Sequence, residues 1–359
     1  MNIEQRHLLG FVRYALMGGD YPHGLLTDRA WREVQRLAKE QTVTGLLYHT
    51  VEQLPGSLRP PQAMLRKLYS DVVYFEQMNE LLNERTCQIF KAYKEIGLRP
   101  RLLKGPGVAS LYRNPEQRMF GDIDIYVPDE HKALLKWIYS QAIPEPQKAG
   151  KEHLLSFEWD GATIENHLVL MRFYNKGLAE KMQKILDDES IWQGEAMVEI
   201  MGEQIPTLPP TLDLFYQIVH FGKHLISSGV GLRQLCDITR TIHRNGSKMD
   251  EDKLTRMFDE LEVRELANAV AAAAVRYLGL NPSEVPYNFR GEGSEQQSER
   301  LMDLVMDGGN FGFWLRNGKR KKGWESFRRR LRQYMRIYPF MPREVRSEIW
   351  LSATGRLSQ

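Results

Sequence analysis

The stretch RMFGDIDIYVP at 118–128 is β-prone and apolar except for two aspartates that stand one residue apart. Side chains alternate along a strand, so Ile123 and Ile125 would face the core together. Asp122 and Asp124 would then share the other face, with Cα atoms roughly 6.5 Å apart. Two like charges at this spacing repel each other unless a cation lies between them. The stretch therefore predicts either a strand whose polar face is built for a cation or an exposed edge strand with solvated carboxylates.

The sequence on either side of this stretch falls into sections that differ in their pattern of apolar residues. Apolar residues at helical spacing run through 61–96, and Gly97 is placed to end that helix. Short apolar runs and turns interleave from 98 to 172, where Asp160-Gly161 predicts a two-residue hairpin turn. We expect an α+β protein in three sections: a helical region at 1–97, a core with a small mixed β-sheet at 98–205, and a helical region with a basic tail at 206–359.

Two of the expected helices begin with a residue that suits the N-cap position. Asp28 precedes an amphipathic stretch in the first section, and Thr211 begins the helix expected at 211–228. Pro106 suits the first turn of a short helix that would run to Tyr112.

The composition excludes several classes of protein. The 359 residues carry a net charge of +3, with 26% charged and 10% aromatic side chains, which is ordinary for a globular protein. Cys87 and Cys236 are too few and too far apart to indicate a disulfide framework or a zinc cluster. The N-terminus lacks the pattern of a signal peptide, and the most apolar stretch, 266–280, is too short to span a bilayer. We expect a cytoplasmic protein without a transmembrane segment.

A third acidic residue could join the paired aspartates. Glu165 stands in the apolar strand just after the predicted hairpin, and His167 follows on the same strand face. Carboxylates on neighbouring strands are the ligands that phosphoryl-transfer enzymes use to hold divalent cations. Asp122, Asp124 and Glu165 are therefore candidate ligands for Mg²⁺ or Mn²⁺ and candidate catalytic residues.

Upstream of the strand, LLKGPGVASLY at 102–112 reads as a strand end, a glycine turn and a helix start. Backbone N–H groups at such a turn can bind phosphate, and Lys104 stands beside Gly105. Arg118 is a candidate second phosphate contact, with an ordinary exposed loop arginine as the alternative.

Taken together, these residues resemble the DNA polymerase β-like nucleotidyltransferase superfamily, and within it a bacterial nucleotidyltransferase family. The resemblance rests on the order LKG, Arg118, DIDI and ENH at 165–167, followed by spaced histidines and LRQLCDI at 232–238. It covers roughly 98–242 and implies a mixed-sheet core, a divalent cation and an NTP substrate. The chain departs from the superfamily pattern at two positions. Pro106 lacks an N–H, although Gly107 and later amides remain, and the third carboxylate is Glu165 where the superfamily more commonly has an aspartate.

The helix expected at 211–228 carries a polar stripe between two apolar ones. His220 and His224 lie on this stripe, and we interpret them as hydrogen-bonded residues that face the nucleotide, with a structural role as the alternative. In the next helix, Asp237 is expected to form an intrahelical ion pair with Arg233 or Arg240.

The segment 314–346 is strongly basic, with twelve Lys and Arg side chains against Glu325 and Glu344. Aromatic residues are interleaved with the charges. This composition suits a nucleic acid or another polyanion, and the alternative is a solvated basic helix that packs through its apolar side chains.

The sequence predicts a metal-dependent nucleotidyltransferase that moves an NMP from an NTP to the hydroxyl or phosphate of an unidentified acceptor. Two alternatives stay open. Pro106 and Glu165 would also fit a catalytically lapsed protein that binds a nucleotide or a partner, and DID at 122–124 could be the DxD of a nucleotide-sugar glycosyltransferase.

Overall fold

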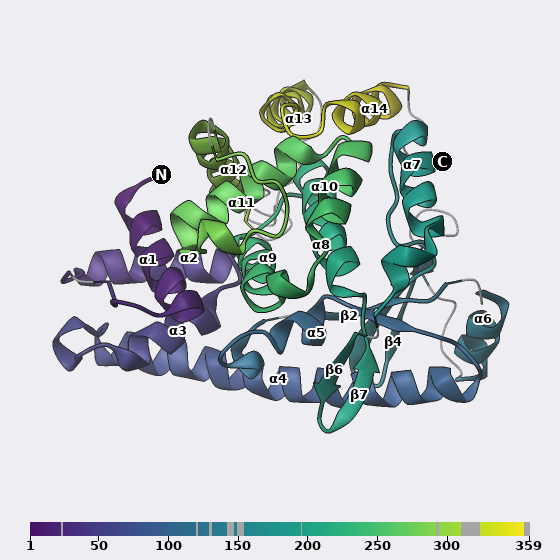
Figure 1. Cartoon of the computed structure of the whole chain (residues 1–359). Helices are drawn as coiled ribbons and strands as arrows, with labels where there is room; N and C mark the ends of the chain where they lie inside the picture. Colours follow the sequence, from purple (N-terminus) through teal and green to yellow (C-terminus); the bar gives the residue numbers. More distant parts are fainter. Residues whose placement is uncertain are drawn as a thin grey trace.

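The computed structural model describes residues 1–22, 24–119, 121–128, 131–141, 147–148, 154–194, 196–291, 294–309 and 324–354. Helices surround one small mixed sheet and one short hairpin (Figure 1). The expected α+β class is confirmed. The division into sections at 1–97, 98–205 and 206–359 stays a prediction.

The central sheet has five strands in the order β1-β2-β5-β4-β3. Its strands are β1 (Arg101–Leu103), β2 (Asp122–Tyr126), β3 (Gln147–Lys148), β4 (Leu154–Trp159) and β5 (Ala162–His167). Strands β2 and β5 are parallel, and the other neighbours are antiparallel. The parallel pair stands in the interior of the sheet, with a further strand on each side of it.

The turn between β4 and β5 is the two-residue hairpin expected from the sequence. Asp160 and Gly161 both have positive φ, at 47° and 83°. This is the geometry of a type I′ turn, which follows the right-handed twist of the paired strands. The turn fixes the β4–β5 register and with it the face on which Glu165 lies.

Helix α4 (Gln62–Glu95) covers one face of the sheet and runs along the base of the molecule (Figure 1). Its C-terminal half packs on the apolar side of the strands, where Ile123, Ile125 and Ile164 are fully buried. Tyr93 donates a hydrogen bond to Asn166 Oδ1 at 3.0 Å within this layer. The apolar face of β2 therefore packs into the core against α4, and its acidic face lies on the opposite side of the sheet.

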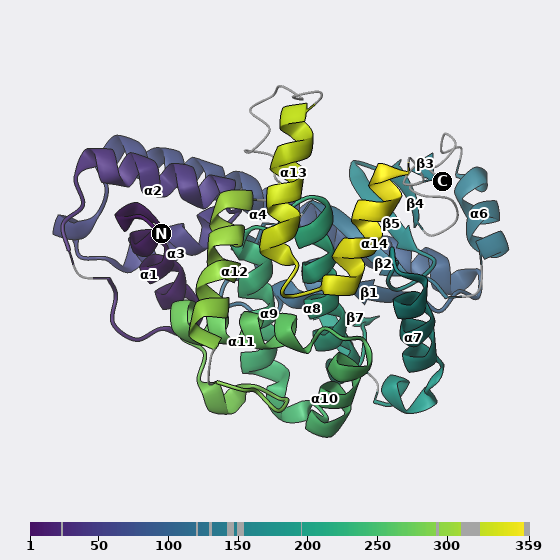
Figure 2. The ribbon, with the colours of Figure 1, turned by 90° about the horizontal axis from the view of Figure 1, so that it is seen from above.

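The helices on that other side come from both ends of the chain. The N-terminal ones are α1 (Ile3–Met17), α2 (Asp28–Glu40) and α3 (Thr44–Gln53). The later ones are α8 (Pro210–Ser227), α9 (Leu232–Asn245), α10 (Glu251–Glu260), α11 (Arg264–Leu278), α12 (Ser294–Gly308), α13 (Trp324–Ile337) and α14 (Pro342–Ala353). One hydrophobic cluster contains buried residues from both groups. Seen from above, α13 and α14 lie over the end of this bundle (Figure 2).

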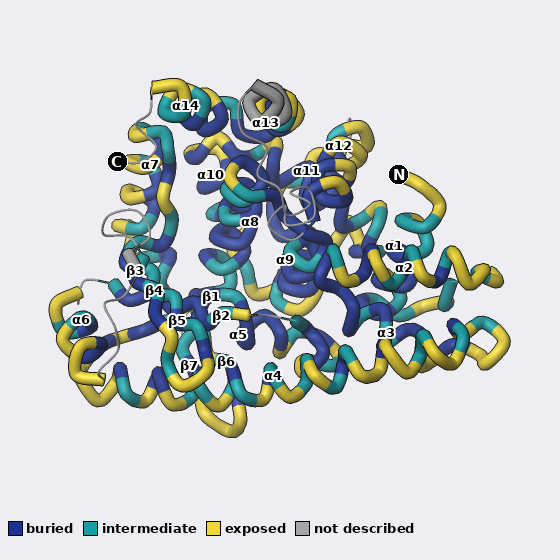
Figure 3. The backbone as a smooth tube through the Cα atoms, turned by 180° about the vertical axis from the view of Figure 1, so that it is seen from behind, coloured by how far each residue is buried: buried dark blue, intermediate teal, exposed yellow. Residues whose placement is uncertain are grey.

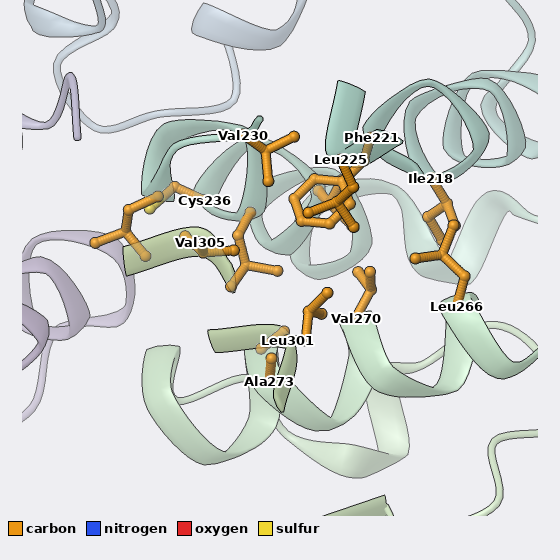
Figure 4. Packing of buried hydrophobic residues seen from close by; sticks show 14 of the residues in the cluster. Ile218, Phe221, Leu225, Val230, Cys236, Leu266, Val270, Ala273, Leu301 and Val305 are labelled. Carbon is orange, nitrogen blue, oxygen red and sulfur yellow. The ribbon is translucent and has the colours of Figure 1, made fainter. Parts of the chain in front are cut away.

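Helix α8 lies at the centre of the bundle. Ile218, Phe221 and Leu225 on α8 pack toward Leu266 and Val270 on α11 (Figure 4). Coloured by burial, α8 is mostly dark blue, whereas α4 shows exposed stretches along its length (Figure 3). A helix that is buried on most sides can hold polar side chains only where they find partners, which makes its polar stripe informative.

Several local expectations need correction. Thr27, not Asp28, caps α2, because the Thr27 side chain accepts from the Ala30 N–H. Helix α8 begins at Pro210, so Thr211 lies in its first turn. Helix α5 (Gly105–Ala109) is only one turn long and stops before Tyr112.

The remaining elements add two features. Helix α6 (His131–Ser140) packs with the apolar side of the sheet, whereas α7 (Lys176–Asp187) adds its buried residues to the cluster of the helices. The sequence pattern did not reveal the hairpin of β6 (Met197–Ile200) and β7 (Glu203–Pro206). In the part of the chain that the structure describes, no helix combines the length and apolar character needed to cross a membrane.

Candidate active site

The parallel pairing of β2 and β5 brings the predicted carboxylates together. In this register Asp124 stands opposite Glu165, and Asp122 stands opposite Thr163. Asp124 and Glu165 lie on the sheet face away from α4, because their neighbours Ile123 and Ile164 are buried on the α4 side. The site is therefore built by strand alternation on two neighbouring strands.

Asp124 is the best-buried member of the group. One of its oxygens, Oδ1, accepts from Lys104 Nζ at 3.1 Å and from His167 Nε2 at 2.8 Å. Its side chain is only 6% exposed. A buried carboxylate needs such donors, since an unpaired charge in this environment is very unfavourable.

Two histidines of α8 continue this network. His220 Nε2 lies 3.3 Å from Lys104 Nζ and 3.2 Å from His224 Nε2. His224 Nδ1 in turn lies 3.0 Å from Ser228 Oγ. The sequence placed both histidines on a polar stripe of α8, and the structure aims that stripe at the lysine of the glycine turn.

The ionisation of these groups follows from burial and from their neighbours. Burial opposes the charge on Asp124, but Lys104 and the His167 hydrogen bond outweigh it and lower the pKa of Asp124. Burial, followed by the charges of Asp124 and Asp122, raises the pKa of Glu165 to about 7. Burial and the nearby Lys104 lower the pKa of His224 to about 3 and that of His220 well below its ordinary value. Both α8 histidines are thus neutral near pH 7.

The donor set fits a divalent cation. Asp124, Glu165 and His167 each offer a ligand atom, and these atoms lie within 4.8 Å of one another. Asp122 is half-buried on the same strand, and the charge of Asp124, followed by burial, raises its pKa. The charge of Asp124 thus raises the pKa of both Asp122 and Glu165, so a cation beside these carboxylates would relieve their repulsion. Hard oxygen donors of this kind suit Mg²⁺ or Mn²⁺.

The glycine turn before α5 holds Lys104 in place. Lys104 and Gly105 both have positive φ, at 47° and 48°, which is unusual for a lysine. The Gly107 N–H donates to the Lys104 carbonyl at 3.1 Å, so this amide is engaged within the turn. The turn thus directs Lys104 at Asp124, and phosphate binding by Gly105 and Gly107 stays a prediction.

Arg118 lies in a buried ion pair. Its Nε and one terminal nitrogen donate to the two carboxylate oxygens of Asp237, each at 2.7 Å, and the Tyr112 hydroxyl donates to the same carboxylate at 2.7 Å. The expected intrahelical pair of Asp237 is therefore wrong. Arg240 instead donates to the carbonyls of Leu111 and Leu16. A nucleotide contact of Arg118 stays a prediction.

This anchor joins the loop before β2 to α9, and sequence reasoning did not find it. The motif LRQLCDI at 232–238 contains Asp237, but the residues near Asp237 in the sequence do not indicate that its partner is Arg118. Arg233, in the same motif, donates to the Met119 carbonyl in the loop that leads into β2. The two contacts fix the start of the strand that carries Asp122 and Asp124.

The basic segment 314–346 lies partly outside the described residues, which include 324–354 but not 310–323. Within the described part, Tyr334 is buried and Leu331 is 39% exposed. Packing through Tyr334 agrees with the alternative of a basic helix held by apolar contacts, and a polyanion partner stays a prediction.

A comparison with protein-family models identifies the family of this chain. The model of one protein family, described as an uncharacterised nucleotidyltransferase, matches residues 27–279, well over half of the chain. The chain therefore belongs to this nucleotidyltransferase family. Among curated proteins, none matches the sequence.

One solved structure that matches is a crystal structure of an antigenic nucleotidyltransferase-like protein from Paracoccidioides brasiliensis. It is 12% identical and covers 55% of this chain and 91% of its own, with a TM-score of 0.31. A similarity this low says nothing about the activity of the chain.

Proposed function

We propose that the protein is a metal-dependent nucleotidyltransferase that transfers an NMP from an NTP to a hydroxyl or phosphate of an acceptor. The observation that carries the proposal is the parallel register that sets Asp124 beside Glu165, with Lys104 bound to Asp124. Membership of a nucleotidyltransferase family supports it.

Asp122, Asp124 and Glu165 would hold Mg²⁺ or Mn²⁺. When bound there, the ion would neutralise the triphosphate and polarise the α-phosphate. Lys104 has two tasks in this proposal. It compensates the charge of Asp124 in the absence of substrate, and its ammonium lies where it can also donate to a phosphate oxygen.

His220 would hold the ammonium of Lys104 in position, since a neutral imidazole can accept from it, and His224 would support His220 from the other side. His167 would fix Asp124 through its hydrogen bond to Oδ1. All three histidines therefore serve the nucleotide site, and none of them needs a positive charge for this role.

As the alternative to its place among the cation ligands, Glu165 is the candidate base when the acceptor is a hydroxyl. The acceptor oxygen forms a bond to the α-phosphorus and gives its proton to the Glu165 carboxylate. The bond between the α-phosphorus and the oxygen that bridges to the β-phosphate breaks, and pyrophosphate leaves with that oxygen. A base with a pKa of about 7 is matched to proton transfer at neutral pH.

The first test is a calorimetric titration of each NTP in Mg²⁺, with wild type beside Asp122→Ala/Asp124→Ala. We expect Mg²⁺-dependent binding that the double variant loses. Glu203→Gln removes an exposed carboxylate of β7 and is the control that should bind like wild type. Absence of NTP binding to wild type, or full binding by the double variant, would contradict the proposal.

A second measurement separates catalysis from a lapsed binding role. Pro106 has no N–H and the Gly107 N–H is engaged in the turn, so the turn offers fewer amides to phosphate than its glycines suggest. Pyrophosphate release in the presence of NTP and hydroxylated acceptors supports catalysis. NTP binding without pyrophosphate release from any acceptor would favour the lapsed alternative.

A further inference from the structure

A cavity of about 320 Å³ lies beside the carboxylate site. Its walls come from the end of β1, from α5, from β6 and from the facing ends of α8 and α9, which meet above α5 in Figure 1. The polar residues of its lining are Lys104, Ser110, Thr207, Asp213, Asn245 and Lys248. Leu102, Val108 and Met197 are among the apolar residues of its lining.

The cavity and the carboxylate site share Lys104, which lines the one and pairs with Asp124 in the other. They also share the polar stripe of α8. Asp213 lies two turns before His220 on this stripe, which is about 10 Å along the helix axis. An occupant of the cavity that extends along α8 would therefore approach the residues that surround Asp124.

The lining indicates what kind of molecule would fit. Asp213 accepts hydrogen bonds, Lys104 and Lys248 donate them, and Ser110 and Asn245 can do both. Hydroxyl groups satisfy all of these partners because each hydroxyl donates and accepts. The apolar residues of the lining, such as Leu102 and Met197, suit the C–H face of a ring.

We propose that this cavity binds the acceptor, and that the acceptor is a neutral hydroxylated small molecule of the sugar, polyol or nucleoside class. The role of the bound molecule as acceptor rests on the proposed nucleotidyltransferase function. The binding of a hydroxylated molecule in the cavity does not depend on it. The volume suits a small ligand, since ligand pockets begin at roughly 300 Å³.

The state of Asp213 supports this assignment. Its Oδ2 accepts from Gln217 Nε2 at 2.9 Å, and Gln217 is itself held by Thr241. Burial raises the pKa of Asp213 to about 7, against the effect of Gln217. The carboxylate is half-buried at the cavity wall, and hydroxyl donors of a bound molecule would stabilise its charged form.

Charge argues against a polyanion at this place. Lys104 and Lys248 are opposed by Asp213 within the lining, and Lys104 is already paired with Asp124. A polyanion site would instead carry an uncompensated group of basic side chains. The nucleotide, with its charged triphosphate, belongs with the cation ligands on β2 and β5.

The experiment uses the full chain and a panel of hexoses, hexitols, cyclitols and ribonucleosides, measured by saturation-transfer NMR and calorimetry. Ser110→Tyr places a ring at the exposed rim of the cavity, and Asp213→Asn removes the charge while keeping an acceptor for Gln217. Glu251→Gln, an exposed carboxylate on α10, is the matched control.

We expect at least one member of the panel to bind wild type and the control, and both cavity variants to weaken that binding by about tenfold or more. Absence of binding by every member, or binding that neither variant changes, would overturn the proposal. A single-stranded oligonucleotide whose binding is lost in both cavity variants would also overturn it, because the site would then serve a polyanion.

Titration of Mg²⁺-NTP into the same proteins keeps the two proposals separate. Asp213→Asn should bind Mg²⁺-NTP like wild type, since Asp213 is not one of the cation ligands. If wild type binds a hydroxylated probe but no NTP, the nucleotidyltransferase proposal fails and the cavity proposal stands. If wild type binds NTP but no probe, the cavity proposal fails alone.

Discussion

Lys104 Nζ lies 3.1 Å from Asp124 Oδ1, so the lysine of the glycine turn occupies a position against the carboxylate where a divalent cation could also bind. Asp124 is nearly inaccessible to solvent, and Lys104 is 23% exposed. The ammonium acts as a counter-ion for the acidic face of β2. A cation and Lys104 would therefore share the task of compensating the same carboxylate.

Replacement of Lys104 by Met should destabilise the protein and make it depend on metal. The change leaves Asp124 with His167 as its described partner, and breaking a buried pair from one side costs about 3–5 kcal/mol. Mg²⁺ or Mn²⁺ should restore part of this loss, because ligands of the folded state stabilise it by mass action. Urea denaturation with and without metal measures both effects. Equal stabilisation of wild type and Lys104→Met by metal would contradict the shared role.

Asp237→Asn should weaken the fold without a direct effect on nucleotide affinity. It removes the charge that holds Arg118 through two hydrogen bonds of 2.7 Å, and we expect a loss of about 3–5 kcal/mol in the free energy of unfolding. Asp160→Asn breaks an exposed pair with Arg85 and should cost about 1 kcal/mol or less. A large fall in Mg²⁺-NTP affinity of the still-folded protein would contradict this expectation, because it would mean that the anchor also positions the nucleotide site.

Glu344→Gln should loosen the loop that follows β5. Glu344 is fully buried, accepts from the backbone N–H groups of Tyr174 and Asn175 at 2.7 and 3.0 Å, and pairs with Lys223 of α8. Loss of its charge should cost about 2–3 kcal/mol, and proteolysis within the loop should become faster. Ser347→Ala removes one hydrogen bond at the same contact and should cost about 1 kcal/mol. Equal losses in the two variants would contradict a special role for the carboxylate.

Asp213→Asn should stabilise the protein, and more so at pH 8 than at pH 5. The pKa of Asp213 is raised to about 7 in the folded state, whereas the pKa of an aspartate in the unfolded chain is about 4. The folded protein therefore binds more protons between these values and loses stability as the pH rises through them. The asparagine variant escapes this loss. Thermal unfolding of both proteins at the two pH values checks the difference, and a gain that is equal at both would contradict it.

The acidic strand and its hairpin could be predicted because their signals are local. Asp122 and Asp124 alternate with apolar residues, which predicts a strand. Asp160-Gly161 is a dipeptide that strongly favours a two-residue hairpin turn. The metal roles of these carboxylates and the phosphate role of Lys104 stay predictions. Their positions, by contrast, follow from strand alternation and one turn.

What the sequence did not reveal depends on partners that are distant in the chain. Asp237 has two arginines at helical spacing, yet it pairs with Arg118 more than a hundred residues away, because the loop before β2 packs against α9. The β6–β7 hairpin was missed because Met201-Gly202 lacks the asparagine or aspartate that usually signals such a turn, although Met201 adopts a positive φ of 52°. The cavity at Asp213 likewise exists only once α5, α8 and β6 have met.

The parallel pairing of β2 and β5 also has a consequence for the order of folding. The β4–β5 hairpin closes through two residues and can form early, with Glu165 still solvated. Glu165 meets Asp124 only when β5 docks beside β2, after the long connection through α6 has closed. The repulsion between the carboxylates thus falls on a late step, and we expect divalent ions to slow unfolding far more than they speed refolding.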